Sequence, residues 1–289
     1  MISELKHVAI LGLGLIGGSI GAAIKRSGFS AEVVGYAPHH GPQALQLGLI
    51  DRYVLSALEA VEGADLVIIA TPPSLVIATI EAIAPNLKKT AVLTDVASTK
   101  HSIVQGVFSM LEQQGHREFI GRFVPGHPIA GAETNGPVAA NPNLFQGANV
   151  ILTPTDQTQV TALALVQGLW AALGAKTQIM SASEHDRCYA LVSHLPHFAA
   201  FALAHSLATQ NDADQLLKAA GSGLRDTTRI AASAPELWVD IFEQNKPALL
   251  AAIDSFEQSL GAMKATLHSG SYAQLANQLK LASDWRRLE

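Results

Sequence analysis

The stretch from residue 8 to residue 24 constrains the fold more than any other part of the chain. It begins with the apolar run Val8–Leu11, which is typical of a strand buried on both faces of a sheet. Glycines follow at positions 12, 14 and 17 with G-x-G-x-x-G spacing, and apolar residues then recur at helical intervals. A strand, a glycine turn and a helix in this order can hold the diphosphate of a dinucleotide at a helix N-terminus.

Each glycine of this loop has its own expected part in dinucleotide binding. Gly12 permits the tight turn, Gly14 lets the backbone approach the diphosphate, and Gly17 lets helix and strand pack closely. We expect the cofactor contacts to include Leu15 and Ile16, which lie between the last two of these glycines. A glycine turn that serves packing alone is the alternative. The span carries no charge, as the apolar segment of a signal peptide would, but its five glycines argue against a signal peptide.

Composition narrows the class of protein. The 289 residues suffice for two domains, and a hydrophobic content of 48% allows a large core. The net charge of −5 argues against a general binder of nucleic acid or of a membrane surface. No other uncharged span reaches the length of a membrane helix. Cys188 is the only cysteine, so no disulfide can form within the chain, which suits a cytoplasmic protein.

The second expected strand, Glu32–Tyr36, bears on the choice of cofactor. An NAD site usually has an acidic residue about 20 residues after the glycines to bind the ribose 2′-hydroxyl. Ala37 stands at that distance, so the acid is missing and a 2′-phosphate is acceptable. His39 and His40 follow and offer weak support for a phosphate, while no arginine is present in this loop. We therefore expect NAD(P)+ with a slight preference for NADP+, and leave the choice open.

Two more buried strands are expected over residues 64–70 and 91–97, each followed by helical sequence. Strands that alternate with helices indicate a parallel, doubly wound sheet, whose ligands bind at the carboxyl ends of the strands. Thr71 and Pro72 follow the first of these strands, and Ser98 follows the second as the expected N-cap of a helix. These side chains should face one crevice.

The motif Gly126–Gly131 is expected to reach the same crevice. Its glycines and proline fix the loop, so His127 would be held firmly beside a nicotinamide and could act as a general base. A structural role is the alternative, because a single histidine among 11 is more often structural. Two late strands are expected over 149–153 and 176–180, around a helix from about 156 to 173.

Strand-like sequence then disappears, and Ser181–Glu184 fits a capping box at the start of a helix. We place the domain boundary here, with a dinucleotide-binding domain over residues 1–181 and a helical domain over residues 182–289. The helical part is rich in alanine and leucine. A small unit of this kind gains from burying a face against a second copy, which predicts a homodimer.

The helical part contains two pairs of candidate ligand-binding residues. His194 and His197 share a helix face, and Pro196 between them predicts a kink. A metal site or two core histidines are the alternatives for this pair, and we expect no metal. Arg225 and Arg229 are four residues apart, so an anion between them would offset their repulsion; a solvated face is the alternative. A long helix is expected from residue 235 to residue 268.

Taken together, these motifs resemble the prephenate and arogenate dehydrogenases of tyrosine biosynthesis. The matching segments follow the order of that family and span most of the chain: Gly12–Gly17, Thr94–Ser98, Gly126–Gly131, Ser193–His197, Arg225–Arg229 and Pro235–Trp238. The resemblance implies an α/β fold with a doubly wound Rossmann-type domain, followed by an all-helical dimerisation domain.

The resemblance also implies roles for residues. His127 would be the catalytic base with Ser98 as its polar neighbour. His197 and Arg229 would hold the substrate, with three further residues close by: Arg225, His194 and Glu133. The implied reaction is oxidative decarboxylation of prephenate to 4-hydroxyphenylpyruvate, with transfer of a hydride to NAD(P)+.

Three alternatives stay open. L-arogenate, or both compounds, is the alternative substrate, because the two differ only by a keto or an amino group on the side chain. A hydroxyacid or imine-type dehydrogenase typically has a helical lysine with an asparagine four residues on, but Lys218 is followed by Ser222 at that offset. A cofactor-sensing protein without catalysis is the third, and the histidines and arginines weigh against it.

Overall fold

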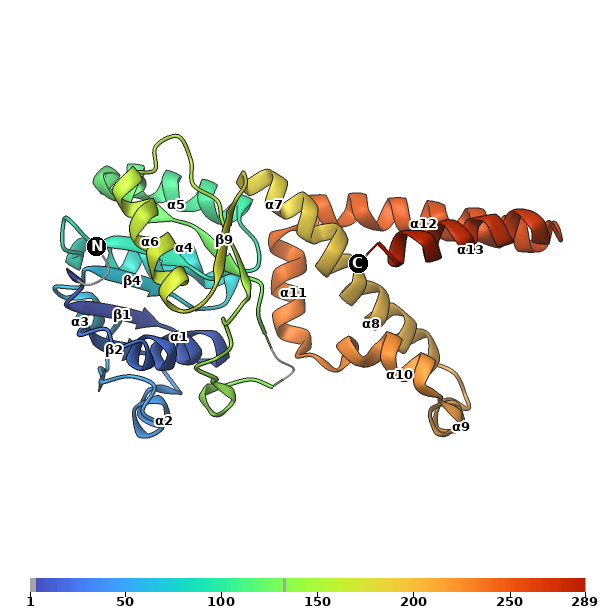
Figure 1. Ribbon diagram of the computed structural model, residues 1–289, viewed down its shortest axis with the longest axis horizontal. Helices are drawn as coiled ribbons and strands as arrows, with labels where there is room; N and C mark the ends of the chain where they lie inside the picture. The colour runs from blue at the N-terminus through green and yellow to red at the C-terminus, as the bar shows by residue number, and fades with distance from the viewer. Residues whose placement is uncertain (1–3, 132–133, 289) are drawn as a thin grey trace.

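The computed structural model describes residues 4–131 and 134–288, which form two parts along the long axis of the molecule (Figure 1). The N-terminal part is a parallel sheet covered by helices. From residue 182 onward every described element is helical, and this part extends away from the sheet. The expected fold class, a doubly wound α/β domain followed by an all-helical domain, is confirmed.

Six parallel strands form the main sheet in the spatial order β3-β2-β1-β4-β5-β6. Because the order runs outward in both directions from β1, the carboxyl ends of β1 and β4 flank the point where the winding reverses, which is where such sheets bind ligands. The strands are β1 His7–Leu11, β2 Glu32–Tyr36, β3 Arg52–Tyr53, β4 Leu66–Ile69, β5 Val92–Asp95 and β6 Phe123–Val124.

Helices cover both faces of this sheet because its strands are apolar on both faces. Successive side chains of a strand point to opposite sides, so Ile10 packs in the cluster with α1 and α6, and Leu11 in the cluster with α3, α4 and α5. The helices of this part are α1 Leu15–Arg26, α2 Gly41–Gln46, α3 Ala57–Val61, α4 Val76–Ile83, α5 His101–Gln113 and α6 Val160–Ala172.

The late strands form a second sheet of their own. β8 (Asn149–Leu152) pairs antiparallel with β7 (Gly126–Pro128) and parallel with β9 (Lys176–Ile179). The strands expected over 149–153 and 176–180 are therefore present, within one or two residues. His127 was expected on a loop and instead lies in the middle of β7, paired with Ile151. The strand ladder holds its backbone more tightly than a loop would.

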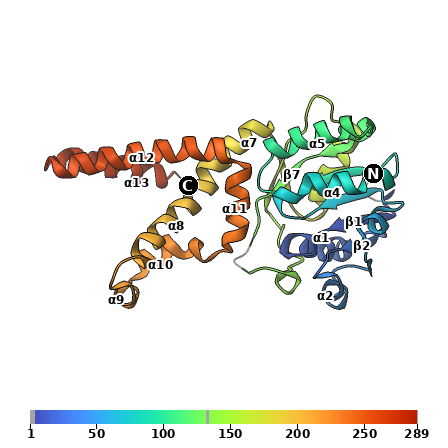
Figure 2. The same cartoon turned by 180° about the vertical axis from the view of Figure 1, so that it is seen from behind.

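The helical part begins with α7 (Ala182–Tyr189), which Ser181 caps by accepting a hydrogen bond from the amide of Glu184, as expected. The long helices α12 and α13 lie side by side in both views and project outward (Figures 1 and 2). The other helices are α8 Leu195–Ala208, α9 Ala213–Ala219, α10 Ser222–Thr228 and α11 Pro235–Gln244, and the long pair spans Lys246–His268 and Tyr272–Arg286. None of the described helices is both long and apolar enough to cross a membrane.

Three local expectations were wrong or incomplete. Ser98 does not cap a helix, since α5 begins at His101 after Lys100. The helix expected over 235–268 breaks at Asn245, because Pro247 in the first turn of α12 has no amide hydrogen to continue the hydrogen-bond pattern of α11. The kink expected at Pro196 takes the form of a π-helical turn over Ala190–His194, a wide turn of the kind that accommodates such a break.

Candidate active site at the junction of the two domains

The glycine loop has the conformation that a dinucleotide site needs. Gly12 has a φ of +101°, and a Cβ there would clash with the carbonyl of Ala70. A Cβ on Gly17 would clash with the carbonyl of Gly12, so neither position accepts a side chain. Gly14 caps α1 without a side-chain hydrogen bond, and no acidic residue stands in the first turn. The amide groups there, which include those of Leu15 and Ile16, are therefore available to an anion.

Gly14 allows a clean test of this loop. Its φ is −78° and a Cβ there would meet no atom within 4 Å, so alanine fits the fold and fills only the open space in front of the helix. We expect Gly14→Ala to weaken NAD+ binding about tenfold or more, through lost charge-assisted hydrogen bonds. The melting temperature should stay within about 3 °C of wild type. Calorimetric titration with NAD+ and thermal unfolding measure the two quantities.

Gly17→Ala is the matched control for this experiment. Its Cβ meets backbone in place of open space, so it should lower the melting temperature as well as the affinity. Unchanged NAD+ affinity in Gly14→Ala would remove the loop from the diphosphate site.

The other expected cofactor residues lie around the same strand ends. The Thr71 hydroxyl, after β4, is buried and has no hydrogen-bond partner among the described residues, so it can serve a ligand. Pro72 is exposed at the start of a short 3-10 turn. Ala37, after β2, packs into the core, so only its backbone can face a cofactor, while His39 is exposed. These positions fit a nicotinamide dinucleotide without requiring any change in the fold.

A buried ion pair anchors the strand that carries His127. The Asp95 carboxylate, at the end of β5, accepts hydrogen bonds from the Lys100 ammonium and from the amide of Gly126. Lys100 also donates to the carbonyl of Gly126, at 2.8 Å. Burial lowers the pKa of Lys100, and the nearby carboxylate of Asp95 opposes that shift. The ion pair thus holds Gly126, the residue before His127, through hydrogen bonds to both its amide and its carbonyl.

His127 also contacts the helical domain directly. Its Nδ1 is 2.8 Å from Nε2 of His185, and Nδ1 of His185 is 2.7 Å from a carboxylate oxygen of Asp186. The ring of Tyr189 lies against both imidazoles, at centroid distances of 4.9 and 4.5 Å. The imidazole expected to act as a base is therefore held by α7 as well as by β7.

Burial keeps His127 neutral. It lowers the pKa of His127 well below its ordinary value, and His185, Lys100 and His194 lower it further. The sequence had suggested a base near the ordinary pKa of about 6.5. The difference arises because only 9% of this residue is exposed, which penalises the charged ring.

The expected substrate residues extend from His127 toward the bundle. Burial lowers the pKa of His194 to about 4, and His194 in turn acts electrostatically on His127. Burial likewise lowers the pKa of His197, and the charge of Arg229 lowers it further. Four expected residues therefore influence one another electrostatically in series, from His127 through His194 and His197 to Arg229, whose side chain is exposed.

These histidines are also fixed in orientation. The side-chain amide of Asn245 lies 3.1 Å from Nδ1 of His194, and the other ring nitrogen of His194 is buried without a partner among the described residues. His197 stacks on Trp238 at a centroid distance of 3.6 Å. The two histidines thus have separate partners, and no group of three or more metal-ligating side chains occurs in residues 4–131 and 134–288.

Three expected residues have no described contact with His127, His194 or His197. Arg225 is exposed, and its Nε donates to the carbonyl of Ala220 within its own segment. Ser98 is half-buried after β5, and no hydrogen bond joins it to His127 in the part of the chain that the structure describes. Glu133 lies outside the described residues.

Sequence analysis missed several residues of this site. Those that contact the expected histidines are His185, Tyr189, Asn245 and Trp238. Asp186 contacts His185, and Asp95 and Lys100 hold the neighbouring Gly126. The capping box at Ser181 was the one local signal, because it places residues 185 and 186 in the second turn of a helix at the domain junction.

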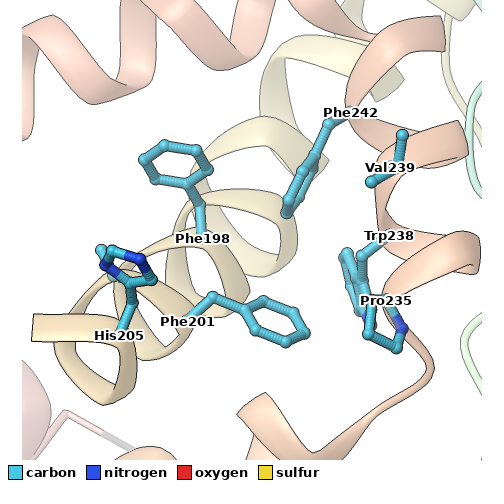
Figure 3. A pocket seen from close by; sticks show the side chains of 8 residues that line it. Phe198, Phe201, His205, Pro235, Trp238, Val239 and Phe242 are labelled. Atoms are coloured by element: carbon cyan, nitrogen blue, oxygen red, sulfur yellow. The ribbon is translucent and has the colours of Figure 1, made fainter. Parts of the chain in front are cut away.

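A separate apolar groove lies between α8 and α11 (Figure 3). Its lining is aromatic and aliphatic apart from His205, and includes Phe201 and Phe242. It includes neither His127 nor an arginine, so it does not suit an anionic substrate.

The fold and the site together define an NAD-dependent oxidoreductase with a dinucleotide-binding domain and a helical second domain. The family model described as the prephenate dehydrogenase nucleotide-binding domain matches residues 20–179, and the one described as the prephenate dehydrogenase dimerization domain matches residues 181–281. Cyclohexadienyl dehydrogenase of Zymomonas mobilis is 36% identical over 272 residues, which cover 93% of this chain and 90% of that relative.

Solved structures agree with these matches. Aquifex aeolicus prephenate dehydrogenase, in complex with hydroxyphenyl propionate and NAD+, has a TM-score of 0.89 and 34% identity over 98% of this chain and 97% of that one. Synechocystis arogenate dehydrogenase has a TM-score of 0.81 and 29% identity over 97% and 99%. The chain belongs to the prephenate dehydrogenase family.

Proposed function

We propose that this protein converts prephenate to 4-hydroxyphenylpyruvate in tyrosine biosynthesis, by oxidative decarboxylation with hydride transfer to NAD(P)+. The observation that carries the proposal is the position of His127. A neutral, buried imidazole lies where the dinucleotide domain meets the helices, and His194 and His197 connect it to Arg229. A base at one end and a guanidinium at the other suit a substrate with a hydroxyl at one end and carboxylates at the other.

The proposed chemistry follows from these residue types. The substrate is a cyclohexadiene with a ring carboxylate and a 4-hydroxyl group. His127 accepts the hydroxyl proton, the ring carboxylate departs as CO2, and the ring becomes aromatic, which makes the reaction effectively irreversible. The nicotinamide, when bound, supplies the hydride acceptor. Burial excludes water from the base and keeps it unprotonated at neutral pH.

Substrate binding is proposed for the residues from the helical domain. Arg229 holds a carboxylate through paired hydrogen bonds, which the planar guanidinium favours. The second ring nitrogen of His194, buried and without a partner among the described residues, can bind the substrate. His197 lies between them, held flat by Trp238. Arg225, Ser98 and Glu133 keep the supporting roles that the family resemblance implies.

The low pKa of His127 predicts the pH dependence of the reaction. A histidine whose folded pKa lies below about 6.5 stays neutral to lower pH, so the base remains ready where an exposed histidine would already be protonated. We expect kcat/KM for the substrate to stay level between about pH 8 and 6.5, and to fall only at lower pH. An acid limb with its midpoint at or above pH 6.5 would contradict the assignment.

We further propose that NADP+ is accepted, with a slight preference over NAD+. No acidic residue follows β2 at the position that would repel a 2′-phosphate, and His39 and His40 are exposed in the adjoining turn. The absence of an arginine in this turn limits the preference.

The test is a two-by-two assay, in which prephenate or L-arogenate is mixed with NAD+ or NADP+ and the absorbance of the reduced nicotinamide is followed. Turnover of prephenate supports the proposal. Turnover of L-arogenate alone would favour the arogenate alternative, for which the likeness to Synechocystis arogenate dehydrogenase is the supporting observation. Binding of cofactor with no turnover of either would favour a sensing protein. Turnover of an added hydroxyacid in its place would favour the hydroxyacid dehydrogenase.

The assembly is proposed to be a homodimer through the helical domain, with the domain boundary at residue 181. Support comes from the match to a dimerization domain and from the large apolar side chains exposed on α12 and α13, among them Phe256, Leu260 and Trp285. The cytoplasmic location expected from the single cysteine stays a prediction.

A further inference from the structure

We propose that His185 and Asp186 are positioning residues that fix the tautomer of His127, so that its Nε2 carries the lone pair and its Nδ1 carries the proton. The proposal rests on the role proposed above for His127 as the base. It adds a pair of residues from the helical domain that do not touch the substrate and act only through His127.

The chain of hydrogen bonds begins at Asp186. Its two carboxylate oxygens accept hydrogen bonds from the backbone amides of Lys100 and His101, each at 2.8 Å. Burial acts to raise the pKa of Asp186, but these amides and His185 together hold that pKa below its ordinary value. A carboxylate in this state only accepts hydrogen bonds. The nitrogen that faces it, Nδ1 of His185, must therefore carry a proton.

The second link is His185 itself. Its side chain has no exposed surface, and burial lowers its pKa against the opposing effect of Asp186, so the ring is neutral. A neutral imidazole has one donor and one acceptor. With the proton on Nδ1, Nε2 of His185 is an acceptor, and the 2.8 Å contact with Nδ1 of His127 requires that His127 donate.

The result is a specific state of the base. His127 donates from Nδ1 and therefore keeps its lone pair on Nε2, the nitrogen left for the substrate. When the substrate hydroxyl gives up its proton, the O–H bond breaks and an Nε2–H bond forms on His127. No proton moves to His185 or Asp186. The imidazolium keeps its hydrogen bond to His185, with the charge of Asp186 one ring away.

Other groups around the pair do not provide a competing acceptor. The Tyr189 ring meets His127 edge-on and is tilted against His185, and burial raises the pKa of its hydroxyl to about 12. The ammonium of Lys100 is taken up by Asp95 and Gly126. Asn245 donates to the backbone carbonyl of Asp186, which fixes the start of α12 against this cluster.

The tautomer can be observed directly. In the wild-type holoenzyme labelled with 15N-histidine, long-range proton–nitrogen correlation spectra should show His127 protonated at Nδ1 and His185 protonated at Nδ1. The His127→Asn and His185→Leu variants assign the two signals. A proton on Nε2 of His127 in the wild type would overturn the proposal, whatever the activity of any variant.

The kinetic arm compares two replacements of His185. Leucine removes the acceptor, so His127 is free to place its proton on Nε2, whereas the Oε1 of glutamine can replace the Nε2 of His185 as acceptor. We expect His185→Leu to lose about tenfold or more in kcat. Its KM values should stay within about twofold, because His185 contacts neither ligand. His185→Gln should recover kcat to within about fivefold of wild type, by the same reasoning.

His116→Leu is the matched control. His116 packs on Phe119 beyond the far end of α5, about 20 Å along the helix from the site, and its replacement should leave kcat unchanged.

Equal losses of kcat in the leucine and glutamine variants of His185 would assign His185 a packing role and overturn the proposal. This experiment can fail independently of the proposed function. If His127→Asn keeps full turnover, the base assignment fails, while the spectra still report whether the tautomer is fixed.

Discussion

Replacing His127 with asparagine should lower kcat by about 10²–10⁴-fold while leaving NAD+ affinity unchanged, because the variant loses the general base and nothing of the glycine loop. Asparagine suits the test, since its amide stands close to where Nδ1 of the imidazole was and can still donate to His185. The buried network therefore keeps its hydrogen bond. Steady-state kinetics with the preferred cofactor and calorimetric titration with NAD+ measure the two effects.

The control for this variant is His116→Asn, which changes a histidine of the same domain that lies outside the site. It should show wild-type kinetics. Turnover of His127→Asn within about tenfold of wild type would exclude His127 as the base, since a lost general base costs at least about 10² in rate.

Replacing Arg229 with glutamine should raise KM for the substrate by about 30-fold or more with a smaller effect on kcat. Arg229 is exposed in the free protein, and in the complex the bound substrate would desolvate the charge pair. Removing one member of such a pair costs about 2–5 kcal/mol, and each 1.4 kcal/mol corresponds to about tenfold in affinity. The loss appears in KM because Arg229 holds the carboxylate in the ground state and in the transition state alike. The charge of Arg229 lowers the pKa of His197, which is consistent with both residues acting on one ligand.

Arg117→Gln is the matched control for this change, because Arg117 is exposed in the dinucleotide domain and pairs with Glu112 at the surface. It should leave KM unchanged, because Arg117 lies outside the site and an exposed ion pair contributes little to stability. If KM for the substrate in Arg229→Gln equals that of the control, the carboxylate is held elsewhere, and Arg225 becomes the residue to test.

Sequence patterns predicted the elements whose formation depends on local periodicity. The four inner strands of the main sheet, β2, β1, β4 and β5, follow from short apolar runs that alternate with helical sequence, and the glycine loop follows from spacing alone. The edge strands β3 and β6 have two residues each and were not predicted. In the second sheet β8 and β9 were expected but β7 was not, because β7 has only three residues and pairs with a strand more than 20 residues away. A three-residue segment carries no periodicity of its own, so His127 was placed on a loop.

The residues of the candidate site also fall into two groups, those predicted from the sequence and those that were not. Residues in recognisable motifs, such as His127, His197 and Arg229, were found from the sequence. The partners that hold them were not, because the hydrogen bond from His127 to His185 joins residues 58 positions apart, and that from Lys100 to Asp186 joins residues 86 positions apart. Lys100 was the least expected, since a lysine with no exposed surface is stable only through contacts that a linear pattern does not display.

The wide turn over Ala190–His194 sets which way the side chains beyond it face. In an uninterrupted α-helix each residue rotates by about 100°, so His194, nine positions after His185, would point to the opposite side at about 180°. A turn that holds one additional residue removes about 100° of that rotation and leaves about 80°. The imidazole of His194 thereby comes within reach of Asn245, whose amide contacts both the backbone carbonyl of Asp186 and the ring of His194. The direction in which His194 and the residues after it point thus depends on the number of residues in a single turn.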